Sequence, residues 1–249
     1  MEPQQGIHMN GTIHHGLALA LALGGALAVL PACAAQDPAD DQEAFDTSAG
    51  NLIAVLRESR GDNKPREGLE PFGRVKVRLE TGRDVDFETS WFRYLGDMHV
   101  RLVFDGRQTM QSASPEDLQR LKLSPEEALK LGVGNLKRRY GEPVVTQWSG
   151  GLMQVEGSSS DLTSSYFLDR DLWQRIQHAH PQGVVVAVPR RGGLVYAPVD
   201  NEDAVDSLRF SAAAMFAGGP GTRLSSALYL FKDGEWSVFQ APSTAQRPQ

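Results

Sequence analysis

The sequence predicts an α+β fold, with a mixed or antiparallel sheet and three to four helices, preceded by a signal peptide and a disordered tether. Three observations support this prediction. Residues 74–80 alternate apolar and charged side chains, as expected for a strand with one buried face. Two Ser-Pro-Glu sequences, at Ser114 and Ser124, are typical of helix starts. Residues 164–199 hold the densest β-forming run and are expected to form the core.

Composition sets the broad class of the protein. The chain has 249 residues, of which 41% are hydrophobic and 22% charged, an ordinary globular range that suits one α+β domain or two closely packed halves. Its net charge of −6 does not indicate a nucleic-acid partner, which usually requires a basic surface. The one cysteine, Cys33, excludes disulfides within the chain and CxxC sites for metal or redox chemistry.

The amino-terminal segment resembles an export signal. Residues 17–30 form an uncharged apolar run of 14, shorter than the roughly 20 residues that span a bilayer as a helix. Such a run is typical of the centre of a secretory signal peptide. The following Leu30-Pro31-Ala32-Cys33 resembles the bacterial lipobox, in which cleavage precedes a cysteine that becomes lipidated. Residues 1–32 are therefore predicted to be a lipoprotein signal peptide, with Met9 as an alternative start.

Lipidated Cys33 would attach the protein to a membrane. Ala34 follows it where some lipoproteins have aspartate, so the resemblance to bacterial sorting rules favours the outer membrane, with the protein facing the periplasm. Ala32-Cys33-Ala34 also fits an ordinary signal-peptidase site, which leaves a secreted or soluble periplasmic protein as the alternative.

The first part of the body is expected to be mainly β-structure. Residues 33–50 are acidic and poor in apolar groups, so they are predicted to be a disordered tether before a domain at 51–241. Residues 52–56 are too short a run to distinguish helix from strand. The strand at 74–80 is expected to return through 85–87, and residues 100–104 form a second hairpin candidate closed by Asp105-Gly106.

Two helices should follow, the first ending near Leu121. The second buries an apolar stripe and ends at Gly141 and Pro143. The cations of its last turn, residues 137–139, suit the helix dipole, with anion binding as the alternative.

The second half alternates strands and helices. Strands are predicted at 144–148, 152–155, 164–168, 183–189 and 194–197, helices at 169–178 and 204–216, a final hairpin at 227–239 turned by Asp233-Gly234, and a disordered tail at 242–249. The connection 169–182 is long enough to join parallel strands through its helix.

The order of these motifs resembles a known family. Ser114-Pro115-Glu116-Asp117-Leu118, Ser124-Pro125-Glu126-Glu127-Ala128, Ser165-Tyr166-Phe167-Leu168-Asp169 and the valine strand 183–189 are similar to the YtpQ-like bacterial proteins of unknown function, over about residues 98–240. The resemblance implies an α+β fold and one domain. In that family an Arg-Asp pair follows the proline of the valine strand; here Gly192 follows Arg191, so the acid is absent.

Candidate ligand-binding residues lie in the same region. Arg190 and Arg191 end the valine strand, and two guanidinium groups can grip a carboxylate or a phosphate. Tyr166 and Asp169 complete the candidate set. The alternative for the arginines is a solvated hairpin turn with basic flanks.

No complete catalytic set is present in the sequence. Ser165 or Asp169 with His178 could form a hydrolase site, although the G-x-S-x-G turn that exposes a nucleophilic serine is absent. His178 and His180 face different sides of a helix, so no metal site is assigned. Gly218–Arg223 lacks the Gly-Lys-Ser/Thr of a phosphate loop, and no cofactor is assigned.

The sequence therefore favours an envelope lipoprotein that is a non-enzymatic binding or scaffold module. Its partner would be a peptide, a protein or a small acidic ligand near Arg190 and Arg191. A secreted hydrolase is the alternative.

Overall fold

The computed structural model describes residues 45–78, 80–106 and 109–243. The predicted signal peptide, Cys33, residues 33–44 of the tether and residues 244–249 of the tail lie outside them. The elements in chain order are η1 (Ala49–Asn51), β1 (Leu52–Glu58), β2 (Glu70–Pro71), β3 (Arg74–Arg78), β4 (Asp84–Glu88), β5 (Trp91–Leu95), β6 (Met98–Asp105), β7 (Met110–Ser112), α1 (Pro115–Leu121), α2 (Pro125–Tyr140), β8 (Val144–Gln147), η2 (Ser149–Gly151), β9 (Met153–Glu156), η3 (Thr163–Leu168), α3 (Arg170–Ala179), β10 (Val184–Arg190), β11 (Gly193–Pro198), α4 (Glu202–Gly218), β12 (Leu228–Lys232) and β13 (Glu235–Gln240), where η marks a 3-10 helix.

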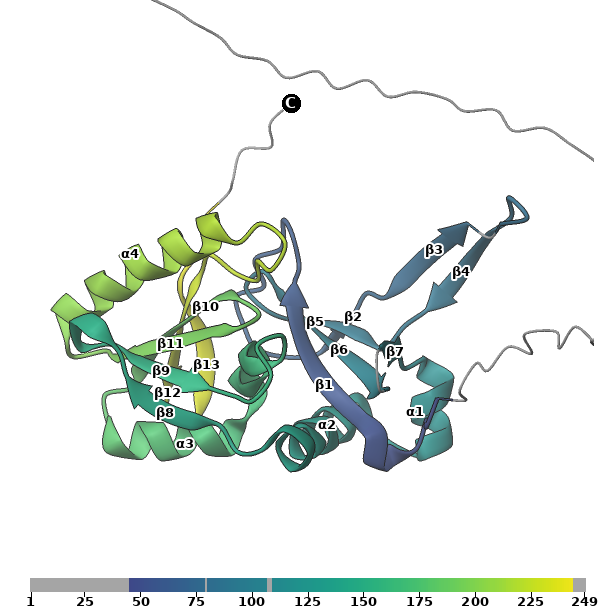
Figure 1. The fold of residues 1–249 in the computed structure, drawn as a ribbon, viewed down its shortest axis with the longest axis horizontal. Coiled ribbons are helices and arrows are strands. Elements are labelled where there is room, and N and C mark those ends of the chain that lie inside the picture. The colour runs from purple at the N-terminus through teal and green to yellow at the C-terminus, as the bar shows by residue number, and fades with distance from the viewer. Residues whose placement is uncertain (1–44, 79, 107–108, 244–249) are drawn as a thin grey trace, which may run out of the picture. The chain divides into compact units, whose positions relative to one another are not determined.

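The predicted α+β class is confirmed. One sheet has the strand order β1-β6-β5-β2, with β7 also paired to β6, and a second has the order β13-β12-β10-β11-β9-β8 (Figure 1). A two-stranded ribbon of β3 and β4 matches the first predicted hairpin. Every strand pair in the described residues is antiparallel, so the possible parallel connection through 169–182 is wrong: β10 pairs antiparallel with both β11 and β12.

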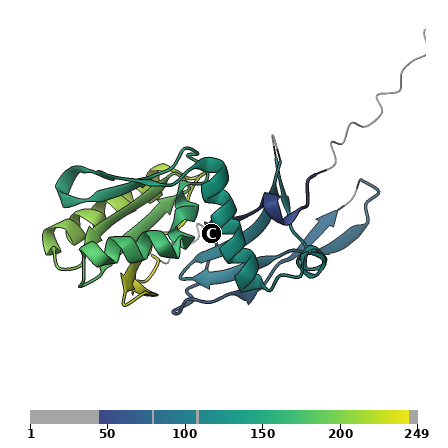
Figure 2. The same cartoon turned by 90° about the horizontal axis from the view of Figure 1, so that it is seen from below.

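The first sheet packs one face on α2 (Figure 2). Leu52, Ala54 and Leu56 alternate toward this face, opposite Phe104, Leu102 and Val100 in register. Gly132 of α2 lies directly over β1, where a Cβ would be only 2.7 Å from the backbone nitrogen of Ala54. This close approach explains why the centre of the helix carries glycine despite its low helix propensity.

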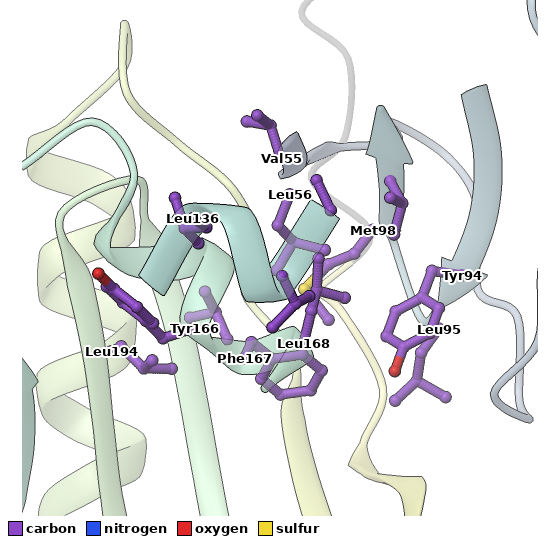
Figure 3. Packing of buried hydrophobic residues seen from close by; sticks show 14 of the residues in the cluster. Val55, Leu56, Tyr94, Leu95, Met98, Leu136, Tyr166, Phe167, Leu168 and Leu194 are labelled. Carbon is purple, nitrogen blue, oxygen red and sulfur yellow. The ribbon is translucent and has the colours of Figure 1, made fainter. Parts of the chain in front are cut away.

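The second sheet is covered on both faces, which explains its continuous apolar strands. Val185 and Ala187 of β10 pack with Val205 and Leu208 of α4. The alternate residues of β10 face η3 and belong to the main core, and α3 contacts β12. That core runs through both sheets, and Figure 3 shows η3 residue Phe167 among its labelled members.

The predicted strand at Ser164–Leu168 is wrong. Residues 163–168 form η3, all of them buried. The N–H of Ser165 donates to the carbonyl of Leu162 at 2.8 Å, a local turn bond in place of a strand ladder. A short apolar run fits any fully buried segment, so burial was predicted correctly but conformation was not. The ambiguous run 52–56 is a strand.

The two Ser-Pro-Glu helix starts are present as predicted. Ser114 and Ser124 each form a capping box with the residue three positions later. The end of the predicted tether, however, belongs to the folded body. The carbonyls of Thr47, Ala49 and Gly50 accept hydrogen bonds from side chains of α1 and α2, and Phe45 packs against the main core.

Candidate functional site

The face of the first sheet that points away from α2 gathers polar and aromatic side chains. Arg57 of β1 lies opposite His99 of β6, and Arg101 of β6 lies opposite Trp91 of β5. Direct partners, and residues two apart on one strand, share a face of an antiparallel sheet. These four side chains therefore lie on one face.

A carboxylate from a distant part of the chain lies against this face. Asp161 belongs to the turn before η3. Its Oδ2 is 3.2 Å from Nη2 of Arg57, and its Oδ1 is 3.0 Å from Nη1 of Arg191. Asp161 thus links strand β1 to the turn between β10 and β11, where the sequence predicted a ligand site.

Main-chain contacts fix the Arg191 turn against the Asp161 turn. The N–H of Ser164 donates to the carbonyl of Arg191 at 2.8 Å. At Gly192 a Cβ would lie 2.7 Å from the carbonyl oxygen of Ser160, so a larger residue requires the backbone to shift. Residue 192 is glycine, and the carboxylate beside Arg191 comes from Asp161.

The other predicted arginine lies differently. The side chain of Arg190 is exposed, and its backbone pairs with Gly193 and Arg223. Ion pairs in the described residues include Arg191 but not Arg190. The structure therefore brings one of the two predicted arginines into a charged cluster.

Arg101 is held by two neighbours. Its guanidinium carbon is 3.8 Å from the centre of the Trp91 ring, a cation–π contact, and its Nε donates to Nε2 of His99 at 2.8 Å. His99 is 3% exposed. Burial, and then the charge of Arg101, lower the pKa of His99 to about 3, so its imidazole is neutral and can accept this bond.

Arg57, Arg101 and Arg191, with Asp161, are named the arginine cluster. Burial lowers the pKa of Arg57 to about 10; Asp161 opposes this shift, while Arg191 and Arg101 add to it. Burial and then Arg191 also lower the pKa of Arg101. With a pKa of about 10, Arg57 remains charged at neutral pH. Three arginines thus lie near one another while one carboxylate pairs with two of them, an arrangement suited to binding an oxyanion through charged hydrogen bonds.

Tyr166 and Asp169 do not join the arginine cluster. Tyr166 is buried, and its hydroxyl donates to the carbonyl of Gly141 at 2.8 Å. Asp169 is also buried; it caps α3 and lies 3.3 Å from Nζ of Lys137. Both contacts stabilise α2 and α3 against η3. Lys137, predicted to favour the dipole of α2, also forms an ion pair.

The residues of the alternative hydrolase site are not brought together as an accessible set. Ser165 is fully buried, and its Oγ accepts a hydrogen bond from the N–H of Leu56 at 3.1 Å. His178 is exposed near the end of α3. Asp169 is engaged with Lys137. A buried serine whose oxygen already bonds the backbone cannot meet a substrate from solvent.

The described residues also line a cleft of about 1170 Å³. Its walls are α2, the start of α3, residues 65–69 and residues 234–237, so it does not open beside the valine strand. Glu67 lies in it and accepts hydrogen bonds from Tyr94 and Arg170. Of the predicted ligand-binding residues, Asp169 lines this cleft.

Sequence reasoning missed Arg57, Arg101, His99 and Asp161. The signal for Arg101 was a charged residue inside an otherwise apolar run, residues 100–104. Its partners depend on strand register and on a contact between residues 57 and 161, which no local pattern encodes.

Two features are absent from the described residues. None of their helices combines the length and the hydropathy of a membrane span. They also contain no group of three or more His, Cys, Asp or Glu residues placed to hold a metal ion.

Comparison with known proteins finds a distant similarity. The chain is 22% identical over 193 residues to UPF0354 protein Bcer98_3354 of Bacillus cytotoxicus. The match covers 77% of this chain and 64% of the relative, so the chain spans less than two thirds of that protein. No family model and no solved structure matches. The likeness suggests an uncharacterised bacterial family, and the relative's name gives no activity.

Proposed function

We propose that this chain is a lipid-anchored protein of the bacterial cell envelope, related to the YtpQ-like family. Its α+β body is a non-enzymatic module that binds a small acidic ligand at the arginine cluster. The apolar run at 17–30 and the lipobox-like sequence ending at Cys33 support the anchor. The distant UPF0354 similarity is consistent with an uncharacterised bacterial protein.

The charge imbalance of the arginine cluster is the observation that carries the binding proposal. Arg57 is only 14% exposed in its side chain, and the shared carboxylate of Asp161 is 49% exposed. Partly buried guanidinium groups are costly to desolvate unless anions pair with them. One half-exposed carboxylate for three arginines leaves capacity for a further anion.

Calorimetric titration tests the binding proposal. The full-length chain in detergent is titrated with inorganic phosphate and, separately, with citrate, at low ionic strength because salt screens such contacts. Arg57→Met and Arg101→Met should each weaken binding by about tenfold or more, since a lost charged hydrogen bond amounts to about 1.5–3 kcal/mol.

Arg190→Met is the matched control. It removes the same charge one residue from Arg191 but outside the arginine cluster. Affinity within about twofold of wild type is expected, because each tenfold change requires about 1.4 kcal/mol. Equal losses in all three variants, or no binding by the wild type, would refute the site.

Processing of the chain in bacterial cells tests the anchor. Globomycin should cause the precursor to accumulate, and mass analysis should find the mature amino terminus at lipidated Cys33. Cys33→Ala should remove the lipid mass. A mature terminus at Ala35, or an intact chain in the cytosol, would contradict lipid anchoring and leave the binding proposal to stand separately.

A further inference from the structure

Asp161 occupies the position that an acidic ligand would take. Its two carboxylate oxygens are divided between two arginines from different strands, 3.2 Å to Arg57 and 3.0 Å to Arg191. Carboxylates and phosphates bind arginine pairs through the same kind of paired N–H donors. Asp161 therefore has the chemistry and the contacts of a bound ligand group.

In the described residues, Asp161 pairs with two of the three arginines, and the third, Arg101, has other partners. Arg101 donates through Nε to His99 and stacks on Trp91. Within the described residues, Arg101 makes its hydrogen bond through Nε, and its Nη atoms pair with no carboxylate. A single carboxylate has two oxygens, whereas a group with three or more oxygens and a charge near −2 could contact all three guanidinium groups.

The surroundings of Asp161 allow its side chain to leave without a change of fold. The backbone of the facing turn is fixed by the bond from Ser164 to Arg191 and by the close approach of Gly192 to Ser160. The side chain itself is 49% exposed. A rotation about χ1 moves a carboxylate between staggered positions while the backbone stays in place.

We propose that Asp161 is a built-in competitor at the arginine cluster, displaced by a multidentate dianion of the phosphate or dicarboxylate class. This inference rests on the proposed function and specifies its ligand class and its regulation. Arg57 and Arg191 would be paired with Asp161 in the ligand-free protein and with the ligand in the complex. Neither state would then leave a buried charge unpaired. The free energy needed to displace Asp161 would set the ligand concentration at which the site fills.

Asp161→Asn is the decisive variant, because it keeps the shape of the side chain and removes its charge. If Asp161 competes, Asp161→Asn should bind inorganic phosphate about tenfold more tightly, equivalent to about 1.4 kcal/mol. Glu70→Gln is the matched control. It removes a carboxylate paired with Arg93, on the same face of the sheet, and should change affinity by less than about twofold.

Two sets of ligands distinguish the chemistry in calorimetry of the full-length chain. Inorganic phosphate and succinate represent the two dianion sources, and acetate represents a single carboxylate. Binding of phosphate or succinate well above that of acetate supports a multidentate site, and the stronger of the two identifies the source. Acetate binding as tightly as both would overturn the ligand class.

Nuclear magnetic resonance tests for exchange directly. If Asp161 formed only a structural ion pair, adding phosphate would leave the arginine signals unchanged. The side-chain Nε–H signals of Arg57 and Arg191 should shift on adding phosphate to the wild-type chain, and that of Arg101 should shift with them. If Asp161→Asn binds phosphate no more tightly than wild type, the competitor role is wrong while the proposed function survives. If neither protein binds, both fail.

Discussion

The two faces of the β1–β6–β5 sheet are formed by alternate residues of the same strands, but they contribute differently to the protein. Toward α2 the strands present Ala54, Leu102 and their apolar neighbours. Away from α2, beyond Val55 and Val103, they present Arg57, His99 and Arg101. The first face buries apolar surface, at about 25 cal/mol per Å². The second buries charge, which costs free energy unless it is well paired.

If the proposed function holds, substitutions on the two faces should affect stability and ligand binding separately. A protein needs the apolar face to fold, whereas replacing partly buried charges by apolar groups of similar size is often neutral or stabilising. The cost of burying this charge is the reason for proposing that the cationic face binds a ligand. Four predictions test the contrast, beginning with the largest effect.

Leu102→Ala should cause the largest loss of stability. Leu102 is fully buried opposite Ala54, beneath α2. Truncating such a residue removes buried surface and leaves a cavity, so the free energy of unfolding should fall by about 2–5 kcal/mol. Urea denaturation followed by circular dichroism measures it. A loss below about 1 kcal/mol would show that the α2 face does not dominate stability.

His99 should make stability depend on pH. Its pKa is about 3 in the folded protein against 6.5 as a reference, so the unfolded chain binds the extra proton between these values. The contribution of neutral His99 to the free energy of unfolding is complete above pH 6.5 and is lost as pH falls toward 3. At about 1.4 kcal/mol per pKa unit, it amounts to about 2–3 kcal/mol between pH 7 and pH 4.5.

The measurement for His99 compares urea unfolding at the two pH values for wild type and His99→Gln. The difference between them isolates the histidine. This comparison is needed because burial raises the pKa of Asp97, so Asp97 makes the folded state more stable as pH falls. If the two proteins show equal pH dependence, the prediction that His99 is buried as a neutral imidazole is wrong.

Arg57→Met should change stability much less than Leu102→Ala. The methionine keeps an apolar stem of similar reach, and Asp161 retains its contact with Arg191. The expected change in unfolding free energy is within about 1 kcal/mol in either direction. Loss of phosphate binding at nearly constant stability would sharpen the contrast between the faces. A loss of more than about 3 kcal/mol would assign Arg57 to folding.

Arg190→Ala should have the smallest effect. Its side chain is exposed and outside the arginine cluster. Exposed substitutions of this kind usually stay within about 0.5 kcal/mol. Thermal unfolding and phosphate titration should both match wild type. A clear loss in either would extend the site to the whole turn, as the sequence alone suggested.

Local patterns predicted much of the fold. The charged alternation at 74–78 gave β3, and the capping serines Ser114 and Ser124 gave both helix starts, because these signals involve residues close in sequence. They failed at residues 163–168, where every side chain is buried and no alternation distinguishes a 3-10 helix from a strand.

The candidate site was predictable only in part. Arg191 was identified because it ends a strand beside a turn. Its partners come from positions 57, 101 and 161, and their meeting depends on strand register and on how the Asp161 turn packs. An arginine within an apolar strand run can signal a charged face, but only three-dimensional packing identifies the other residues on it.

Ser165 lies against the open edge of the first sheet. β1 is the outermost strand of its sheet, and an uncovered outer strand invites backbone pairing with another chain. The hydroxyl of Ser165 accepts the N–H of Leu56, so η3 occupies one backbone donor on this open edge. The serine considered as a nucleophile instead satisfies a backbone donor that pairing with another strand would use.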